Sequence, residues 1–346
     1  MLKLDKYLIS VDNAFELKNV QFIDLRSPIE FEEAHIPGAI NIPLLEDDER
    51  KIVGTIYKQH SPDLALEEGF GFIAPKLPDI CLKIKNIGNA YYPVIYCWRG
   101  GMRSQALSNV LDIMSIKHFR LYGGYKAFRN YVLEYFSQPF KQNVIVLDGL
   151  TGVGKTDLIQ EIIKLGLPAI DLESLANNHG SVFGCIGLGK QPQQKHFEGL
   201  LLAKCLKQKD KPNIIVECES RRIGSVSIPE TFFTAMKNGQ HILIHDIIEN
   251  RIKRITDNYV IKNNDQNRES IRNAIYGLKK RLGLKNTNNL IYLFENNEYS
   301  KVVEILLKDY YDPLYAFPSE HSNKYKINIS SVDMAYAVDV LRSLIG

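Results

Sequence analysis

The most specific chemical signal in the sequence is a glycine-rich turn in the segment VIVLDGLTGVGKTDLIQ, residues 144–160. The turn has the spacing G-x-x-x-x-G-K-T of a Walker A phosphate-binding loop. Glycines let backbone N–H groups approach a phosphate closely, the following helix N-terminus adds partial positive charge, and the lysine adds a full charge. We therefore predict diphosphate binding here rather than an ordinary glycine turn. The predicted binding residues are Gly149, Gly152, Val153, Gly154, Lys155 and Thr156, with Thr156 also a candidate Mg²⁺ ligand.

A second site is predicted in the loop CWRGGMRS, residues 97–104. Its cysteine follows an apolar strand and precedes a helical pattern, so loop amides, the helix dipole and nearby arginines favour the thiolate and an adjacent oxyanion. The alternative is a buried structural cysteine, but arginine and glycine neighbours are poor core formers. We predict Cys97 as catalytic, within an oxyanion loop formed by Trp98, Arg99, Gly100, Gly101, Met102 and Arg103.

Further polar residues lie beyond the glycine-rich turn. The strand-like segment NIIVECESRRIG places two carboxylates near its end, and the candidates for binding Mg²⁺ or a water are Asp171, Glu217 and Glu219. Residues 251–285 contain ten lysines and arginines against three acids, which indicates either a solvated face or contacts with RNA phosphates. The candidate contacts with RNA are Arg251, Arg254, Lys279, Lys280 and Arg281. The aromatic side chains of residues 310–317 either pack in the core or stack against a base or an isoprenoid.

The elements that position these residues alternate between strands and helices. Apolar runs predict strands at 20–27, 41–44, 91–97, 144–147, 213–224 and 241–247, and helical periodicity follows at 104–114, 126–138 and 155–165. Alternating strands and helices indicate parallel sheets, in which ligands bind beyond the carboxyl ends of the strands. Both predicted loops occupy such positions.

Length and composition limit the classes of protein. A chain of 346 residues favours two domains, which we place at 1–140 and 141–346. No signal peptide or membrane span is recognisable, so a cytoplasmic location without membrane contact is expected. Five cysteines without a C-x-x-C pair argue against a disulfide framework or a thiolate zinc site, and Cys81, Cys185 and Cys205 are interpreted as structural. The net charge of +3 does not by itself indicate a nucleic-acid-binding protein.

Three segments resemble the rhodanese domain, a sulfur-carrying α/β module: IDLRSPIEFEEAHIPGAINIP (23–43), CWRGGMRS (97–104) and LYGGYKAFR (121–129). Ala34 stands where the familiar pattern has glycine. Five residues separate Cys97 from Arg103, whereas sulfur-transferring rhodaneses usually have a shorter loop. The wider loop resembles that of related phosphatases and suits a phosphate-sized oxyanion.

The whole chain resembles the bacterial tRNA 2-selenouridine synthases. The resemblance rests on residues 49–72, which a minimal rhodanese domain lacks, on YCWRGGMRS, on the Walker A segment and on YYDPLY (310–315). It implies a rhodanese-like α/β domain followed by a P-loop NTPase-like parallel α/β domain with a helical C-terminal part.

The resemblance also implies a transferase that modifies the wobble uridine of the tRNA anticodon. Such an enzyme geranylates 2-thiouridine with geranyl diphosphate and then replaces the geranylated sulfur by selenium from selenophosphate, for which it requires a selenophosphate source. Whether Cys97 carries a perselenide or attacks the nucleoside stays open. Two alternatives are a P-loop kinase or NTPase with a regulatory rhodanese domain, and a sulfur-relay protein that binds tRNA. The sequence leaves the metal and the oligomeric state undetermined.

Overall fold

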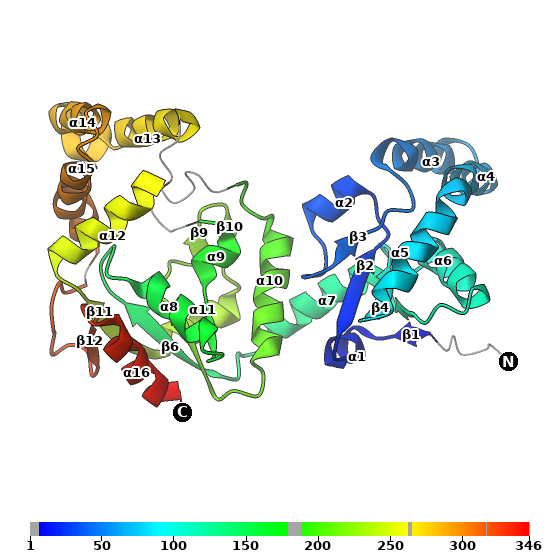
Figure 1. Ribbon diagram of the computed structural model, residues 1–346, viewed down its shortest axis with the longest axis horizontal. Coiled ribbons are helices and arrows are strands. Elements are labelled where there is room, and N and C mark those ends of the chain that lie inside the picture. Colours follow the sequence, from blue (N-terminus) through cyan, green and yellow to red (C-terminus); the bar gives the residue numbers. More distant parts are fainter. Residues whose placement is uncertain (1–6, 179–188, 262–264, 316, 346) are drawn as a thin grey trace. The chain divides into compact units, whose positions relative to one another are not determined.

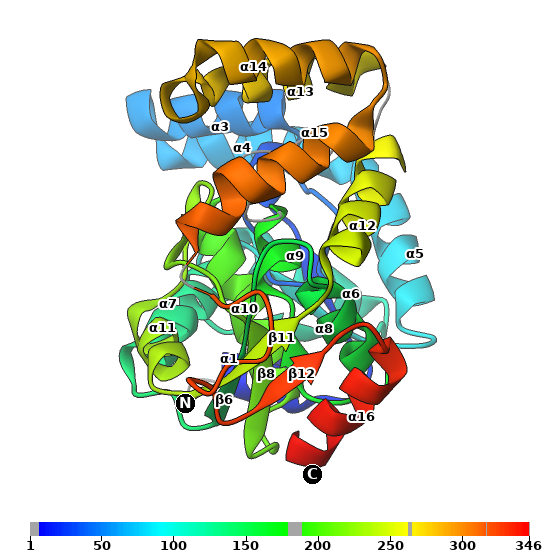
Figure 2. The same cartoon turned by 90° about the vertical axis from the view of Figure 1, so that its left-hand side faces the viewer.

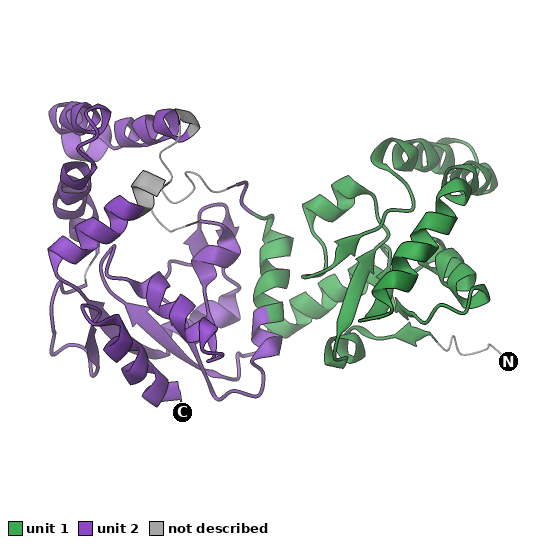
Figure 3. Ribbon diagram, viewed as in Figure 1, with its two compact units in different colours: residues 1–137, 192–203 green, residues 138–191, 204–346 purple. Residues whose placement is uncertain are grey.

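The predicted strands form two separate parallel sheets in the computed structural model, which describes residues 7–178, 189–261, 265–315 and 317–345 (Figure 1). The chain divides into two units (Figure 3). Unit 1 comprises Met1–Ser137 and Pro192–Ala203, and unit 2 comprises Gln138–Gln191 and Lys204–Gly346. The predicted α/β class, with a rhodanese-like part before a P-loop part, is confirmed.

Unit 1 contains a sheet with the strand order β1-β5-β4-β2-β3. Its strands are β1 (Leu8–Ile9), β2 (Val20–Asp24), β3 (Ile40–Asn41), β4 (Tyr92–Tyr96) and β5 (Phe119–Leu121). Its helices are α1 (Val11–Glu16), α2 (Pro28–Glu33), α3 (Asp47–Gln59), α4 (Pro62–Ile73), the 3-10 turn η1 (Ala74–Lys76), α5 (Leu77–Ile87), α6 (Met102–Ile113) and α7 (Gly124–Ser137).

Alternation along β2 divides the core of unit 1 between the two faces of the sheet. Ile23 belongs to the cluster that packs α5 and α6 against the sheet. Phe22 points the other way and contacts Phe15 of α1, whose ring also approaches Phe128 of α7. Helix α10 (Gln194–Lys207) begins in unit 1, where Gly199 leaves room for the Phe128 ring.

Unit 2 contains a sheet with the strand order β12-β11-β6-β8-β7. Its paired strands are β6 (Asn143–Asp148), β7 (Ala169–Ile170), β8 (Asn213–Glu217), β11 (Gln240–His245) and β12 (Asn328–Ser330), with a small hairpin of β9 (Arg222–Ile223) and β10 (Val226–Ser227). Helices α8 (Lys155–Lys164) and α16 (Met334–Ile345) share one apolar cluster with Ile145 and Leu147 of the central strand β6. Helices α9 (Leu172–Ala176) and α11 (Glu230–Lys237) complete this part.

The C-terminal helices of unit 2 have their own core (Figure 2). They are α12 (Ile248–Ile261), α13 (Asp265–Gly277), α14 (Lys279–Glu295) and α15 (Tyr299–Leu306), followed by the π-helical turn η2 (Leu307–Tyr311) and the 3-10 turn η3 (Asp312–Leu314). Ile275, Leu290, Phe294 and Leu307 are buried together in this core. Within the described ranges, no helix has both the length and the apolar composition that a membrane span requires.

Candidate functional site

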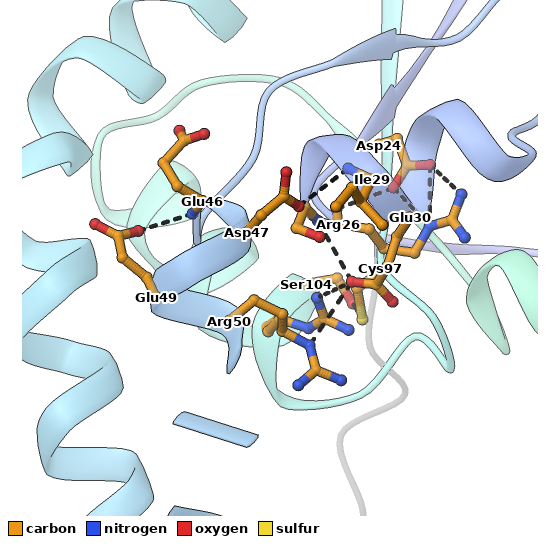
Figure 4. A network of polar contacts seen from close by, with 12 residues as sticks. Asp24, Arg26, Ile29, Glu30, Glu46, Asp47, Glu49, Arg50, Cys97 and Ser104 are labelled. Carbon is orange, nitrogen blue, oxygen red and sulfur yellow. Dashed lines mark hydrogen bonds and ion pairs between the residues drawn. The ribbon is translucent and has the colours of Figure 1, made fainter. Parts of the chain in front are cut away.

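The thiol loop, defined here as residues 97–103, connects β4 to α6 (Figure 4). Cys97 directly follows the strand and is 3% exposed. Its Sγ atom lies 3.4 Å from Ser104 Oγ, and the Ser104 hydroxyl donates to the Gly101 carbonyl at 3.1 Å. The thiol therefore donates to the Ser104 hydroxyl, and because a hydroxyl has one proton, Ser104 would have to turn away from Gly101 O to donate to a thiolate. Ser104 did not figure among the predicted site residues, although it occupies the first turn of α6.

The thiol loop is held against the segment LYGGYK by backbone contacts. Tyr125 N donates to Cys97 O and Lys126 N donates to Trp98 O, each at 2.9 Å. Arg120 Nη1 donates to Gly100 O at 2.6 Å. Gly124 has φ +59°, and a Cβ atom there would lie 2.2 Å from Cys97 O, so only glycine permits this approach. The third rhodanese-like segment (121–129) thus fixes the position of the second (97–104).

A buried ion pair packs against aromatic side chains of the thiol loop and of α7. Arg26 binds Asp24 through two nitrogens at 2.6–3.1 Å and donates to Ala34 O at 2.7 Å. The Arg26 guanidinium also lies 4.2 Å from the Tyr125 ring centroid and 5.8 Å from that of Trp98. Such stacking on aromatic faces suits arginine better than lysine. Burial raises the pKa of Tyr125 to about 12, so its hydroxyl stays protonated at neutral pH.

The other predicted members of the thiol loop lie at its surface. Trp98, Arg99, Gly101 and Met102 are exposed, and Gly100 is half-buried. Arg103 Nη1 lies 3.3 Å from Glu30 Oε2, and Arg50 Nε of α3 lies 3.7 Å from the same oxygen. The structure therefore places a third arginine, Arg50, at the edge of this site.

The P-loop, residues 149–156, connects β6 to α8 in unit 2. Gly149, Gly152 and Gly154 all have positive φ, and a Cβ atom at Gly149 would lie 2.3 Å from Ile244 O. Lys155 Nζ donates to Gly149 O at 2.7 Å and to Leu150 O at 3.1 Å. Burial lowers the pKa of Lys155, whereas the nearby Glu173 and Glu219 oppose that change. The Lys155 side chain thus folds back over the P-loop. An ammonium group in this position can contact an anion that the loop binds.

Carboxylates surround the P-loop lysine. The Thr156 hydroxyl lies 3.3 Å from Glu173 Oε2, and Glu173 N donates to Glu217 Oε1 at 2.8 Å. Burial, followed by the charge of Glu173, raises the pKa of Glu219 to about 8. Burial, followed by Asp171, also raises the pKa of Glu217 well above its ordinary value. Glu217 and Glu219 therefore lie near Lys155 as predicted candidates, and Glu173 joins them.

Asp171 directly follows β7 and Cys218 directly follows β8, and each has its own surroundings. Asp171 accepts a hydrogen bond from Ser174 N at 2.8 Å and caps α9. Cys218 lies between Glu217 and Glu219 in the sequence. Burial raises the pKa of its thiol, and the neighbouring Asp148 carboxylate adds to the effect. The Cys218 thiol also interacts electrostatically with Lys155 and Glu219.

Two of the predicted tRNA contacts instead hold the P-loop. Arg251 is 2% exposed, donates to Thr151 O at 2.9 Å and binds Asp312 through two nitrogens at 2.6 and 3.0 Å. Arg254 donates to Gly152 O and pairs with Asp157 and Asp246. Asp312 belongs to YYDPLY, whose Tyr315 hydroxyl also bonds the Thr151 side chain. This segment therefore forms part of the P-loop site, and RNA contact stays a prediction for the other three cations.

Those three cations lie together on unit 2. Lys279, Lys280 and Arg281 are exposed in the first turn of α14, before a backbone kink at Gly283. Lys279 Nζ lies 4.3 Å from the centroid of the exposed Tyr276 ring. The predicted aromatic cluster divides, because Tyr311 is buried in the helical core while Tyr315 stacks on Phe317 near the P-loop.

The cysteines interpreted as structural and the possible metal site have the following surroundings. Cys81 and Cys205 are buried, and Cys185 lies outside the described residues. Throughout the described part of the chain, no group of three or more histidine, cysteine or acidic side chains has the arrangement of a metal site. Thr156 and Glu173 still offer two adjacent oxygen ligands.

Comparisons with known proteins identify both domains of the chain. The family model described as "tRNA 2-selenouridine synthase AAA domain" matches residues 142–343, and the model described as "Rhodanese-like domain" matches residues 9–131. A tRNA 2-selenouridine synthase of Pseudomonas syringae pv. syringae (strain B728a) is 33% identical over 339 residues, covering 89% of this chain and 91% of the relative. A relative of the same name from Hydrogenovibrio crunogenus is 33% identical, covering 91% of this chain and 93% of its own.

Proposed function

The chain belongs to the tRNA 2-selenouridine synthase family, and on this premise we propose that it converts 2-thiouridine at the tRNA wobble position into 2-selenouridine. The observation that supports this most strongly is the presence in one chain of two intact anion-binding loops with different reactive groups. One loop presents the Cys97 sulfur beside Ser104, and the other presents the Lys155 ammonium. The two loops match the two chemical steps of the proposed reaction.

The first step is alkyl transfer at the P-loop. The loop binds the diphosphate of geranyl diphosphate, and the sulfur of 2-thiouridine attacks the adjacent geranyl carbon. A carbon–sulfur bond forms while the carbon–oxygen bond breaks, diphosphate leaves with the electron pair, and the N3 proton of the base passes to solvent. Lys155 stabilises the charge that develops on the leaving group, which is the usual role of a preorganised cation in a closed site. Its Nζ atom exchanges the carbonyls of Gly149 and Leu150 for diphosphate oxygens.

A divalent cation fits this site as an additional component. Mg²⁺ usually binds one or two protein oxygens together with substrate phosphates. The Thr156 hydroxyl and the Glu173 carboxylate, 3.3 Å apart, would hold it. When bound, it would supply further positive charge to the diphosphate.

The second step uses the thiol loop. Selenophosphate binds beside Cys97. The Cys97 thiolate attacks C2 of the geranylated base and displaces the geranylthiolate; the selenium of selenophosphate then attacks the same carbon and displaces the Cys97 thiolate, and water cleaves the selenium–phosphorus bond to release phosphate. The Ser104 hydroxyl, 3.4 Å from Cys97 Sγ, can donate to that thiolate once it turns away from the Gly101 carbonyl. The tRNA itself is held partly through its phosphates, for which Lys279, Lys280 and Arg281 are the candidates.

One experiment tests the proposal and its rivals. Thiolated tRNA is incubated with geranyl diphosphate and then with selenophosphate, and its digested nucleosides are identified by mass spectrometry. We expect S-geranyl-2-thiouridine first and 2-selenouridine afterwards. ATP or GTP turnover without either nucleoside would support a P-loop kinase or NTPase. Binding of tRNA without nucleotide turnover or either product would support a sulfur-relay protein.

A further inference from the structure

Two arginines converge on one carboxylate at the edge of the thiol loop. We propose that Arg50 and Arg103 together bind the phosphate group of the selenium donor, with Glu30 holding both arginines until that phosphate replaces it. The proposal rests on the proposed function for the identity of the donor. It assigns a binding role to α3, the helix that begins in the segment a minimal rhodanese domain does not need.

The distances indicate a loose arrangement that an anion can replace. A single oxygen, Glu30 Oε2, lies 3.3 Å from Arg103 Nη1, 3.7 Å from Arg50 Nε and 3.4 Å from Ser27 N. By contrast, the buried pair of Arg26 and Asp24 in the same unit is bidentate at 2.6–3.1 Å. Partly exposed ion pairs of the looser kind contribute little to stability. Two guanidinium groups and one carboxylate leave this cluster with one net positive charge.

The chemistry of the cluster fits a phosphate dianion. A guanidinium donates two parallel hydrogen bonds to a phosphate, and two guanidinium groups match its double negative charge. Glu30 offers only one charge, which the two arginines share. The side chains of Arg103, Glu30 and Arg50 are 21%, 24% and 42% exposed, so a small anion can reach them from solvent.

The cluster lies next to the reactive sulfur. Arg103 immediately precedes Ser104, whose Oγ atom lies 3.4 Å from Cys97 Sγ (Figure 4). A phosphate held by Arg103 is therefore bound at the end of the thiol loop where the sulfur has its hydroxyl neighbour. This arrangement would separate the recognition of the phosphate from the handling of the selenium atom.

The first turn of α3 is anchored so that Arg50 faces α2. Asp47 Oδ1 accepts a hydrogen bond from Ile29 N at 3.0 Å (Figure 4). Glu49 pairs with Lys76. Glu49 also closes a capping box with Glu46 at the start of the helix. These contacts position the backbone of α3 independently of the contact between Arg50 and Glu30. Replacing Arg50 should therefore leave the helix in place.

The kinetic test uses opposite charge changes on the full chain. Arg50→Ala should raise the KM for selenophosphate about 10- to 100-fold, the effect of losing a charged hydrogen bond, with kcat little changed. Glu30→Gln should lower the KM about two- to fivefold, because it retains the capping group but removes the competing charge. Lys58→Ala at the other end of α3 is the matched control and should change neither. Geranylation should be the same in all four proteins.

These outcomes separate a binding role from a structural one. If the ion pairs only tie α3 to α2, Arg50→Ala and Glu30→Gln will change the KM in the same direction or leave it unchanged, and the proposal is overturned. Should the parent chain form no selenouridine, the proposed function fails, and inorganic phosphate serves as a direct probe. In a Lys155→Ala background, calorimetry should detect phosphate binding that Arg50→Ala weakens; equal binding with and without Arg50 would refute the site.

Discussion

The thiol loop and the P-loop share a local geometry and differ in what surrounds it. Each follows a parallel strand and leads into a helix, at β4–α6 and β6–α8. Around the thiol loop, the charged groups are arginines at a partly exposed edge. Around the P-loop, the lysine is enclosed together with Glu173, Glu217 and Glu219. The same strand–loop–helix arrangement therefore places a buried thiol near partly exposed arginines in unit 1 and an enclosed ammonium group among carboxylates in unit 2.

The two loops are also held by different means. Backbone N–H groups of Tyr125 and Lys126 and the close approach of Gly124 hold most of the thiol loop, and one arginine side chain, Arg120, adds a contact to Gly100 O. Arginine side chains from α12 hold the P-loop through the carbonyls of Thr151 and Gly152. A loop held by backbone packing depends on small residues, whereas one held by long side chains depends on buried charge pairs. The predictions below test this difference.

Cys97→Ser should have the largest effect. It keeps the shape of the thiol loop but replaces a thiol with a hydroxyl that stays protonated, so selenouridine formation should stop. Alkyl transfer should continue at the P-loop, and S-geranyl-2-thiouridine should accumulate in mass spectra of digested tRNA. Normal selenouridine would remove Cys97 from the mechanism. Loss of both nucleosides in a folded protein would contradict the division of the steps between the loops.

Lys155→Ala should affect the other step. Loss of one charge-assisted contact in a closed site costs roughly 2 to 4 kcal/mol, or about 30- to 1000-fold in rate. Single-turnover geranylation of thiolated tRNA measures the effect. Lys164→Ala on the exposed end of the same helix is the control and should keep the parental rate. A folded Lys155→Ala protein with the parental rate would disprove the P-loop assignment.

Arg251→Met should destabilise unit 2 selectively. The side chain is 3% exposed, and its removal leaves Asp312 without its bidentate partner, at a cost of about 3 kcal/mol in the free energy of unfolding. The single tryptophan, Trp98, reports on unit 1 by fluorescence, while circular dichroism reports on both units. The urea concentration at the midpoint of the fluorescence transition should therefore not change, whereas part of the circular dichroism transition should move to lower urea. Arg272→Met, which breaks an exposed pair with Glu295, should cost less than about 1 kcal/mol.

Charge reversal of Lys279, Lys280 and Arg281 should weaken tRNA binding. If each contacts a phosphate, the slope of log affinity against log salt should fall by roughly two to three. The matched control reverses the exposed Lys58, Lys83 and Lys85 of unit 1. An unchanged slope in the first variant would identify the start of α14 as a solvated face.

The smallest effect is a contrast in pH dependence. Burial lowers the pKa of His196 in unit 1 to about 4, so its contribution is present above about 6.5 and is lost as pH falls toward 4. Glu219 in unit 2 has its pKa raised to about 8, so its contribution is present below about 4.5 and is lost as pH rises through 8. Urea unfolding at a series of pH values, followed by the two optical signals, should show these opposite trends. Glu219→Gln should reduce the pH dependence of the unfolding free energy of unit 2 and leave that of unit 1 unchanged.

Much of the fold and the centres of both sites are determined by local sequence. The sequence pattern of an apolar strand, a glycine-bearing turn and a helical period predicts two strand–loop–helix segments. Both occur where they were predicted, as β4–α6 and β6–α8. Cys97 and Lys155 lie in those loops because positive φ at Gly100 and Gly154 is encoded by the glycines themselves. These features depend on residues close together in the chain.

The tertiary structure decided which distant side chains complete the sites. Arg251 and Arg254 belong to a basic run that looks the same in sequence whether it faces solvent or a loop, and they lie about 100 residues from the carbonyls they bind. Glu173 near Lys155 and Arg50 near Glu30 are likewise long-range neighbours. Periodicity shows that a helix has a polar face, but only the packing of helices against the sheet determines which polar group that face meets.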